Sequence, residues 1–233
     1  MDVAIFLAYC LPMRKNLATH DPPGLNKPGQ AVRALRNKLG LTLQEVSERT
    51  GLAVSTISKL EMGRASMSYE KLSLMSVGLG INMSELLGLL ADSTETEAAP
   101  SVPGPGRRVV QRLGEGLVVQ TDSYPQTFLA VELLNKQLVP LITEVRARSV
   151  QEFVAEFGGL IKHAGEEFTY VLEGEIEFHS EFYAPVRLKS GESVYIDSSM
   201  GHAYIAVSDG PCRVLCVCTG EADHVIGQFQ KQE

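Results

Sequence analysis

Cysteine is scarce in this sequence: only 4 of its 233 residues are cysteines, and no two of them form a Cys-x-x-Cys pair. This usage argues against a disulfide framework and predicts a protein of the reducing cytoplasm. Cys212, Cys216 and Cys218 lie in one strand-like run, and their even numbers put them on one face of it. We therefore expect buried free thiols there rather than a redox or thiolate–metal site.

Long apolar stretches are missing as well. No segment approaches the ~20 consecutive apolar residues that a membrane-spanning helix needs, so we expect no membrane partner. The apolar run at residues 3–11 follows Asp2 and has no basic leading segment, which makes it a poor signal peptide. Residues 1–12 are either the natural beginning of the chain or an extension ahead of a true start at Met13.

Positive charge is in the minority, with 21 Lys and Arg against 28 Asp and Glu and a net charge of −7. Taken alone, this balance argues against nucleic acid as a partner. The acidic excess lies in residues 91–106 and 107–233, however, whereas residues 30–90 carry seven basic and five acidic side chains. A mildly basic N-terminal domain is sufficient for phosphate contact when a dimer presents two copies of it.

Composition and periodicity divide the chain into four segments. Residues 1–29 predict a disordered lead-in, and residues 91–106, which are acidic and rich in Pro and Gly, predict a linker. Residues 30–90 have helical periodicity and predict an all-α domain of five helices. Residues 107–233 predict an all-β domain, a double-sheeted barrel or jelly roll. Its expected strands are 116–120, 128–134, 138–145, 167–172, 175–178, 194–196, 202–207 and 213–217.

Capping signals mark the expected helices. Thr42-Leu-Gln-Glu45 and Asn82-Met-Ser-Glu85 are capping boxes, and Ser68 is an N-cap. In the first helix, which begins at Gln30, we expect one inward stripe and one outward stripe. The inward residues are Val32, Leu35 and Leu39, and the outward residues are Arg33, Arg36 and Lys38.

A helix, a short turn with glycine and a second helix form the helix-turn-helix arrangement. Residues 41–63 closely resemble the phage-repressor (XRE) type of this motif, and the match covers all five helices. The resemblance implies that double-stranded DNA is bound by Gln44, Val54, Ser55, Thr56, Lys59 and Arg64. The alternative is that these side chains form only a solvated helix face. Glu61 is expected to act in helix packing or capping, without a role in DNA binding.

A histidine and a carboxylate lie four residues apart in His163-Ala-Gly-Glu-Glu167, and the strand that follows ends at Gly174. Gly191 and His202 come later in the chain. This spacing resembles the two motifs of the cupin superfamily, a double-stranded β-helix, over roughly residues 107–220. The resemblance implies a site formed by His163, Glu167 and His202. Tyr204 should point into the barrel, either to bind a ligand or as a core aromatic residue.

The chain departs from the cupin pattern at three positions. Ile161 occupies the place of the first histidine, Asp197 that of a proline and Ala206 that of an asparagine. Two histidines and one carboxylate remain, a set that suits Fe(II), Mn(II), Zn(II) or Ni(II). The alternative is a metal-free pocket in which His163 and Glu167 bond to an organic ligand or to each other.

Two functions fit this sequence. In the first, the protein is a transcriptional regulator, a homodimer on operator DNA whose barrel senses a small-molecule effector. In the second, it is an iron-dependent oxidase or epoxidase. The segment at residues 163–168 and the order of the two domains are similar to those of the hydroxypropylphosphonic acid epoxidases. The regulator ranks first because the recognition helix has a small, polar face, and because no acid–base set, Gly-x-Ser-x-Gly motif or phosphate loop is visible.

Overall fold

The computed structural model describes residues 28–91 and 106–219. Residues 1–27 of the predicted lead-in and 92–105 of the predicted linker lie outside the described residues. The helices are α1 (Pro28–Lys38), α2 (Leu43–Thr50), α3 (Val54–Glu61), α4 (Tyr69–Leu79), α5 (Met83–Ala91) and α6 (Val150–Phe157). The strands are β1 (Leu117–Val119), β2 (Gln126–Phe128), β3 (Leu138–Glu144), β4 (Glu166–Glu173), β5 (Glu175–Ser180), β6 (Val186–Lys189), β7 (Ser193–Asp197), β8 (His202–Ala206) and β9 (Arg213–Thr219).

The five predicted helices form the first body of the molecule, and both capping predictions for its central helices are confirmed. Thr42 and Glu45 form a reciprocal capping box at the start of α2, and Gly51 ends that helix with a φ of 72°. Ser68 caps α4 by accepting a hydrogen bond from the Lys71 amide. The glycine at the end of α2 allows the sharp turn that brings α3 against it.

The start and the packing of α1 differ from expectation. The helix begins at Pro28, inside the segment predicted to be disordered, because proline suits the first turn of a helix. A Cβ on Gly29 would lie 2.0 Å from the Leu60 carbonyl oxygen, so α1 and α3 pack in close contact there. Leu39, predicted to face inward, is exposed because it lies beyond the last helical residue.

Arg36 was predicted to face outward and is instead buried. Its Nε donates to Glu61 Oε1 at 2.6 Å and its Nη2 to Glu61 Oε2 at 3.0 Å. A two-point contact of this kind satisfies both charges inside the packed helices. It also confirms the packing role expected of Glu61, which joins α1 to α3.

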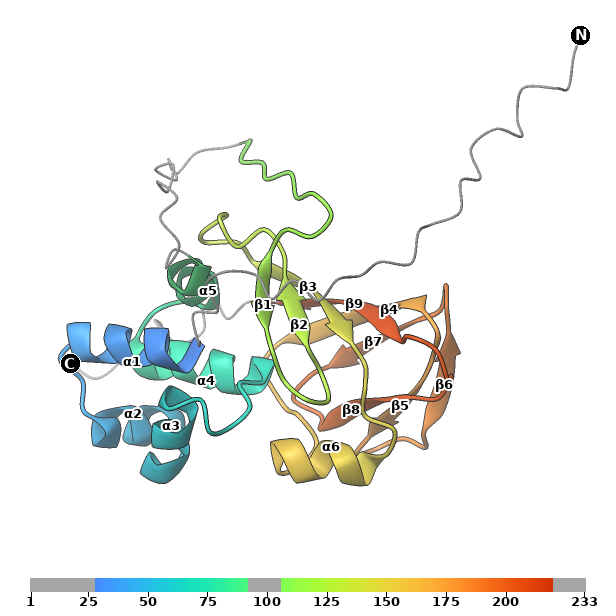
Figure 1. Ribbon diagram of the computed structural model, residues 1–233, viewed down its shortest axis with the longest axis horizontal. Coiled ribbons are helices and arrows are strands. Elements are labelled where there is room, and N and C mark those ends of the chain that lie inside the picture. Colours follow the sequence, from blue (N-terminus) through green and yellow to red (C-terminus); the bar gives the residue numbers. More distant parts are fainter. Residues whose placement is uncertain (1–27, 92–105, 220–233) are drawn as a thin grey trace, which may run out of the picture.

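The strands form two sheets in the second body (Figure 1). One has six strands in the order β1-β2-β3-β9-β4-β7, and the other has three in the order β6-β5-β8; neighbouring strands of the described residues pair antiparallel in both sheets. Buried residues alternate with exposed or partly exposed ones along β4 and β9, as a strand with one face on the core requires. The predicted class, helical domain plus all-β domain, is therefore confirmed in its main lines.

Three predictions about the second body were incomplete. The expected strand 128–134 is wrong over most of its length, because β2 ends at Phe128 and Ala130 and Asn135 have positive φ values of 50° and 53°. Strand β6 was not expected. Helix α6 was not expected either, although Ser149 is its N-cap. The helix packs against the sheets through Phe153, which is buried.

The two bodies are in direct contact, and side-chain hydrogen bonds join them at two of the places where they meet. The first lies between α5 and the turn after β2, where Ser84 Oγ donates to the Lys136 carbonyl at 3.3 Å. The second lies between the segment joining α3 to α4 and helix α6, where the Ser66 hydroxyl donates to Glu156. Within the described residues, no single helix is long and apolar enough to span a membrane; α4 and α5 pass such a test only as a pair bent by 102°.

Candidate functional site

The loop that leads into β4 brings together His163 and Glu167, two of the three predicted metal ligands. Ile161 pairs with His202 at the start of β8 through two backbone hydrogen bonds of 3.0 Å, which holds His163 beside the second sheet. Gly165 then turns the chain with a φ of 92°, and a Cβ there would lie 2.1 Å from Thr219 Oγ1. Only glycine fits this turn, which lets Glu167 reach the core from β4.

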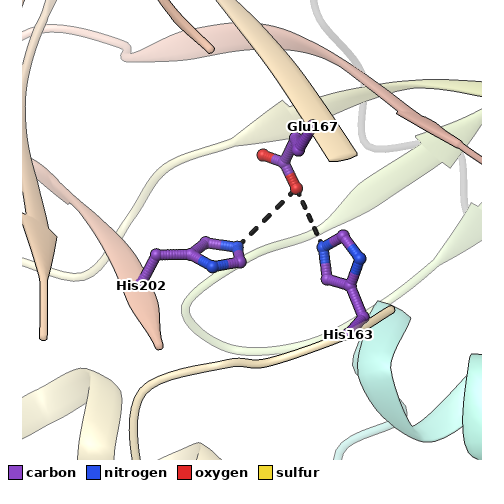
Figure 2. A group of neighbouring side chains, drawn as sticks. All are labelled: His163, Glu167 and His202. Atoms are coloured by element: carbon purple, nitrogen blue, oxygen red, sulfur yellow. Dashed lines mark hydrogen bonds and ion pairs between the residues drawn. The ribbon is translucent and has the colours of Figure 1, made fainter. Parts of the chain in front are cut away.

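His163, Glu167 and His202 are all buried and converge on one point (Figure 2). His163 Nε2 lies 3.0 Å from Glu167 Oε2, and His202 Nε2 lies 3.7 Å from the same oxygen. One donor atom from each residue can be chosen so that all lie within 4.8 Å of one another. The structure thus brings together the three residues predicted as metal ligands.

A second layer of hydrogen bonds fixes how these side chains point. His202 Nδ1 lies 2.9 Å from the Met200 carbonyl oxygen, so that nitrogen carries the proton and Nε2 faces Glu167. The second oxygen of Glu167 accepts hydrogen bonds from the Tyr204 hydroxyl and the Thr169 hydroxyl, each at 2.7 Å. Tyr204 points into the site as predicted, and its hydroxyl is already engaged.

The site favours a charged carboxylate. Burial alone would raise the pKa of Glu167, but hydrogen bonds and charge interactions with His163 and His202 hold it well below its usual range. Burial likewise would lower the pKa of His202, and its contact with Glu167 raises it above the ordinary value. The core therefore contains an ionised carboxylate with imidazole partners.

Two of the predicted buried thiols line the same cavity. Cys216 and Cys218 lie opposite Thr169 and Glu167 on the neighbouring strand β4, and the Cys218 Sγ is 3.5 Å from Glu167 Oε2. Both are free, as is Cys212. Burial, followed by the charge of Glu167, raises the pKa values of Cys216 and Cys218 well above the ordinary thiol value. These thiols stay protonated at neutral pH, as the prediction of inert free cysteines requires.

The donor set fits a divalent metal ion. Two imidazole nitrogens and a carboxylate oxygen match the ligands of Fe(II), Mn(II), Zn(II) and Ni(II), and a set of three leaves coordination positions open. Ile161, which replaces the first cupin histidine, lines the cavity beside the triad and offers no fourth ligand. The buried triad could therefore hold a metal ion through His163, Glu167 and His202.

The residues predicted to contact DNA lie on α2, α3 and the segment that follows α3. Gln44, Ser55, Lys59 and Arg64 are exposed, and Val54 and Thr56 are partly exposed. Inward-facing Ile57 and Leu60 are fully buried, so α3 turns its apolar side to the helical core and its polar side to solvent. Arg64 lines a groove of about 420 Å³ together with Arg33 of α1, a second cation that the sequence analysis did not assign to this face.

Comparison with known families agrees with both halves of this arrangement. The helix-turn-helix family matches residues 32–86, and the cupin domain family matches residues 154–218. The chain joins a helix-turn-helix domain to a cupin domain. The first match spans all of the predicted DNA-contacting residues, and the second contains the triad.

Relatives of this helix-turn-helix–cupin chain share both domains over most of their length. The HTH-type transcriptional regulator PuuR of Escherichia coli strain K12 is 24% identical over 194 residues, which cover 82% of this chain and 94% of PuuR. PuuR of Shigella flexneri matches equally. The crystal structure of an HTH_3 family transcriptional regulator from Vibrio cholerae is 17% identical, has a TM-score of 0.52, and covers 82% of this chain and 94% of that one. This last likeness concerns the fold alone.

The hydroxypropylphosphonic acid epoxidase from S. wedmorenis also overlaps with the chain. It is 20% identical and has a TM-score of 0.40, with coverage of 82% of this chain and 96% of that one. A superposition this loose does not bear on function.

The sequence analysis missed several residues that line the cavity or hold Glu167 in place. Thr169 lies two residues after Glu167 on β4, so the two-residue period of a strand could have revealed it. Gln126 of β2 and Tyr69 of α4 also line the cavity. Neither has a local signal, because Tyr69 belongs to the helical domain and Gln126 lies 37 residues before His163.

Proposed function

We propose that this protein is a sequence-specific DNA-binding transcriptional regulator of the cytoplasm. Its helix-turn-helix domain would bind operator DNA, and its cupin cavity would bind a small-molecule effector. The observation that carries the proposal is that one chain combines an exposed polar recognition helix with a buried, hydrogen-bonded cavity. PuuR, a transcriptional regulator by name, is similar over 94% of its length and supports the same reading.

In this proposal, α3 enters the major groove and its exposed side chains read the bases. Ser55 and Lys59 are suited to base edges, because a hydroxyl and an ammonium group can both donate hydrogen bonds there. Val54, with Thr56 beside it, would contact a thymine methyl group. Gln44 at the start of α2 and Arg64 after α3 would contact phosphates and fix the orientation of the helix.

A divalent metal in the triad would supply an electrophilic centre for an oxygen of the effector. His163, Glu167 and His202 would hold the ion. Tyr204 and Thr169 would orient the Glu167 carboxylate from its other oxygen, as residues behind metal ligands commonly do. Fe(II), Mn(II), Zn(II) and Ni(II) are all compatible with this donor set.

The regulator would act as a homodimer through the outer face of the six-stranded sheet. The centre of this face is a cluster of apolar side chains: Phe168 lies opposite Val217 and Tyr195, and Tyr170 lies opposite Leu215, with Ser193, Glu166 and Asp197 around them. Phe168, Tyr170 and Tyr195 are exposed by 37%, 37% and 63%. A two-fold contact uses the same patch on both subunits. The two helix-turn-helix domains of the dimer, its reading heads, would then bind half-sites about one helical turn apart.

Effector binding would alter transcription only by favouring one arrangement of this dimer over another. A ten-fold change in operator affinity needs about 1.4 kcal/mol of coupling between the cavity and the helix-turn-helix domains.

An electrophoretic shift of the DNA upstream of the protein's own gene tests the proposal. Binding should weaken steeply with salt, with a slope of about −0.9 per phosphate contact in a double-logarithmic plot. Lys59→Ala should reduce specific affinity by about 1–3 kcal/mol. Lys189→Ala, an exposed lysine on β6 of the cupin domain, is the matched control and should bind like the wild type. Equal losses in both variants would contradict the assignment of α3.

An iron-dependent oxidase remains the second candidate, and the donor set of the triad favours it. Two histidines and one carboxylate with open positions are the ligands of non-haem iron oxygenases. Such an enzyme would consume oxygen in the presence of iron and a substrate, and Lys59→Ala would leave its turnover unchanged. A regulator would show no such turnover and would lose operator recognition in the same variant.

A further inference from the structure

The wall of the cupin cavity includes one residue from the DNA-binding domain. Tyr69, the first residue of α4, is buried, and its ring centroid lies 4.6 Å from that of His163 with the planes at 65°. The ribbon of α4 runs beside His163 in Figure 2. Among the described residues that line the cavity, Tyr69 is the one supplied by the helical domain.

The cavity is too small for a metabolite in this arrangement. Its volume is about 30 Å³. One water molecule needs about 10–15 Å³ measured in this way, whereas small-molecule sites typically measure about 300–1,000 Å³. The closed cavity can therefore hold an ion or a water molecule, and an organic effector can enter only if part of the wall moves.

A buried polar atom indicates that the cavity is built for a polar ligand. Gln126 is only 6% exposed and lines the cavity, yet its Oε1 has no hydrogen-bond partner among the described residues. An unpaired buried acceptor costs free energy that a bound donor group would recover. Gln126 thus offers a contact to a ligand that also reaches the triad.

Tyr69 is the part of the described wall that is carried by a helix of the other domain and not by the two sheets. The triad and Gln126 are held by sheet pairing or by backbone bridges, so their displacement would break backbone hydrogen bonds. The segment carrying Tyr69 is tied to α6 by side chains: Ser66 donates to Glu156, and the Lys71 ammonium lies 5.8 Å from the Phe157 ring centroid. Side-chain contacts of this kind are individually weak.

We propose that Tyr69 is an effector-contacting residue that closes the cavity, so that the effector site is shared between the two domains. This inference rests on the proposed regulatory function. Seven residues separate the end of α3 at Glu61 from Tyr69. A polar effector that displaces or repositions Tyr69 therefore shifts the start of α4, a helix that packs against α2 of the helix-turn-helix and follows the recognition helix in the chain. The cupin site and the DNA-reading surface are coupled through this one side chain.

The buried thiols of the cavity provide a probe that needs no knowledge of the effector. Cys216 and Cys218 line the cavity, whereas Cys212 is equally buried but does not. Trypsin cleaves after Arg213 and so separates Cys212 from the other two. Iodoacetamide labelling, followed by peptide mass analysis, should show that Tyr69→Ala speeds labelling of Cys216 and Cys218 by about ten-fold, or about 1.4 kcal/mol in the opening equilibrium. Labelling of Cys212 should not change.

Each outcome decides the inference. Equal acceleration at all three cysteines would mean general loosening, and no acceleration would mean that Tyr69 does not close the cavity; either result overturns it. If Tyr69→Ala does not fold, Ser66→Ala is the second variant. It leaves the cavity wall intact but releases the contact with Glu156, and it should accelerate the same two thiols by a smaller factor.

Operator DNA separates this inference from the proposed function. A saturating upstream DNA fragment should change the labelling rate of Cys216 and Cys218 in the wild type and leave that of Tyr69→Ala unchanged, because coupling between two sites is reciprocal. If a DNA fragment binds without altering the labelling rate of the wild type, the proposed coupling between the cavity and the DNA-binding surface is refuted. A protein that binds no fragment refutes the regulatory function, while the labelling of the DNA-free protein still decides whether Tyr69 closes the cavity.

Discussion

Glu167 is the residue on which the chemistry of the cavity depends. One of its oxygens faces two imidazoles, and the other accepts hydrogen bonds from Tyr204 and Thr169. A buried carboxylate is costly unless such partners satisfy it. The same set of partners would keep the side chain in place for a metal ion or for a polar effector.

Removal of either imidazole of the triad should abolish metal binding without affecting the fold of the helix-turn-helix domain. His163→Ala and His202→Ala are expected to lose cobalt(II) binding and the response to effector, and to keep operator binding, because the triad lies in the cupin domain. Cobalt absorption spectra and operator shifts measure the two properties. His179→Ala is the control, since His179 pairs with Glu177 outside the triad. Full effector response in either triad variant would contradict the assignment of the pocket.

Protons should compete with a metal for His202. Burial lowers its pKa, but the stronger combined effect of Glu167 and the Met200 carbonyl raises it above 6.5. A metal binds the neutral imidazole, so cobalt affinity should fall as the pH drops through this raised pKa, by about ten-fold per pH unit, and should level off above it. Cobalt titrations across neutral pH measure this. An affinity that is constant from acid to neutral pH would exclude His202 as a ligand.

The triad could be predicted from the sequence because its spacing resembles the cupin motifs. Arg36 was placed on the wrong side of α1 because periodicity treats every arginine as a surface residue. Its partner Glu61 is 25 positions away and belongs to another helix. Tyr69 was missed for the same reason, since a contact between domains leaves no local pattern.

The elements that carry strong capping signals were predicted best. The capping box of Thr42 and Glu45 predicts where α2 begins, and the N-cap Ser68 predicts where α4 begins. The structure confirms both helix starts. Helix α6 carries the same type of signal, Ser149 followed by Glu152, but the alternating pattern around it led to a prediction of strands alone. Strand β6 has one buried residue in four, which leaves little periodicity to detect.

The Arg36–Glu61 pair should matter for the stability of the helical domain. Glu61→Ala leaves the Arg36 guanidinium largely buried with only the Leu41 carbonyl as acceptor, and we expect a loss of about 2–3 kcal/mol in the free energy of unfolding. Urea denaturation followed by circular dichroism measures it. Glu48→Ala removes an exposed carboxylate of α2 and should change stability little. A similar small effect at Glu61 would show that the pair contributes nothing.

At the scale of the whole molecule, the domains are placed by contacts from both ends of the helical body. Helix α5 lies against the turn after β2, and the segment before α4 lies against α6 (Figure 1). In this structure, the orientation of one helix-turn-helix domain relative to its cupin domain therefore depends on contacts within a single chain. The distance between two reading heads depends on how two copies associate.

The outer face of the six-stranded sheet should control that association. Phe168→Glu places a charge between Tyr195 and Val217, and desolvating this charge in an apolar contact is unfavourable. We expect monomers in analytical ultracentrifugation and a loss of operator affinity, because a single head makes half of the contacts. Phe182→Glu, an exposed aromatic position just after β5, is the matched control and should remain dimeric. A Phe168→Glu protein that stays dimeric would place the interface elsewhere, and a monomer that keeps full operator affinity would show that one reading head is sufficient.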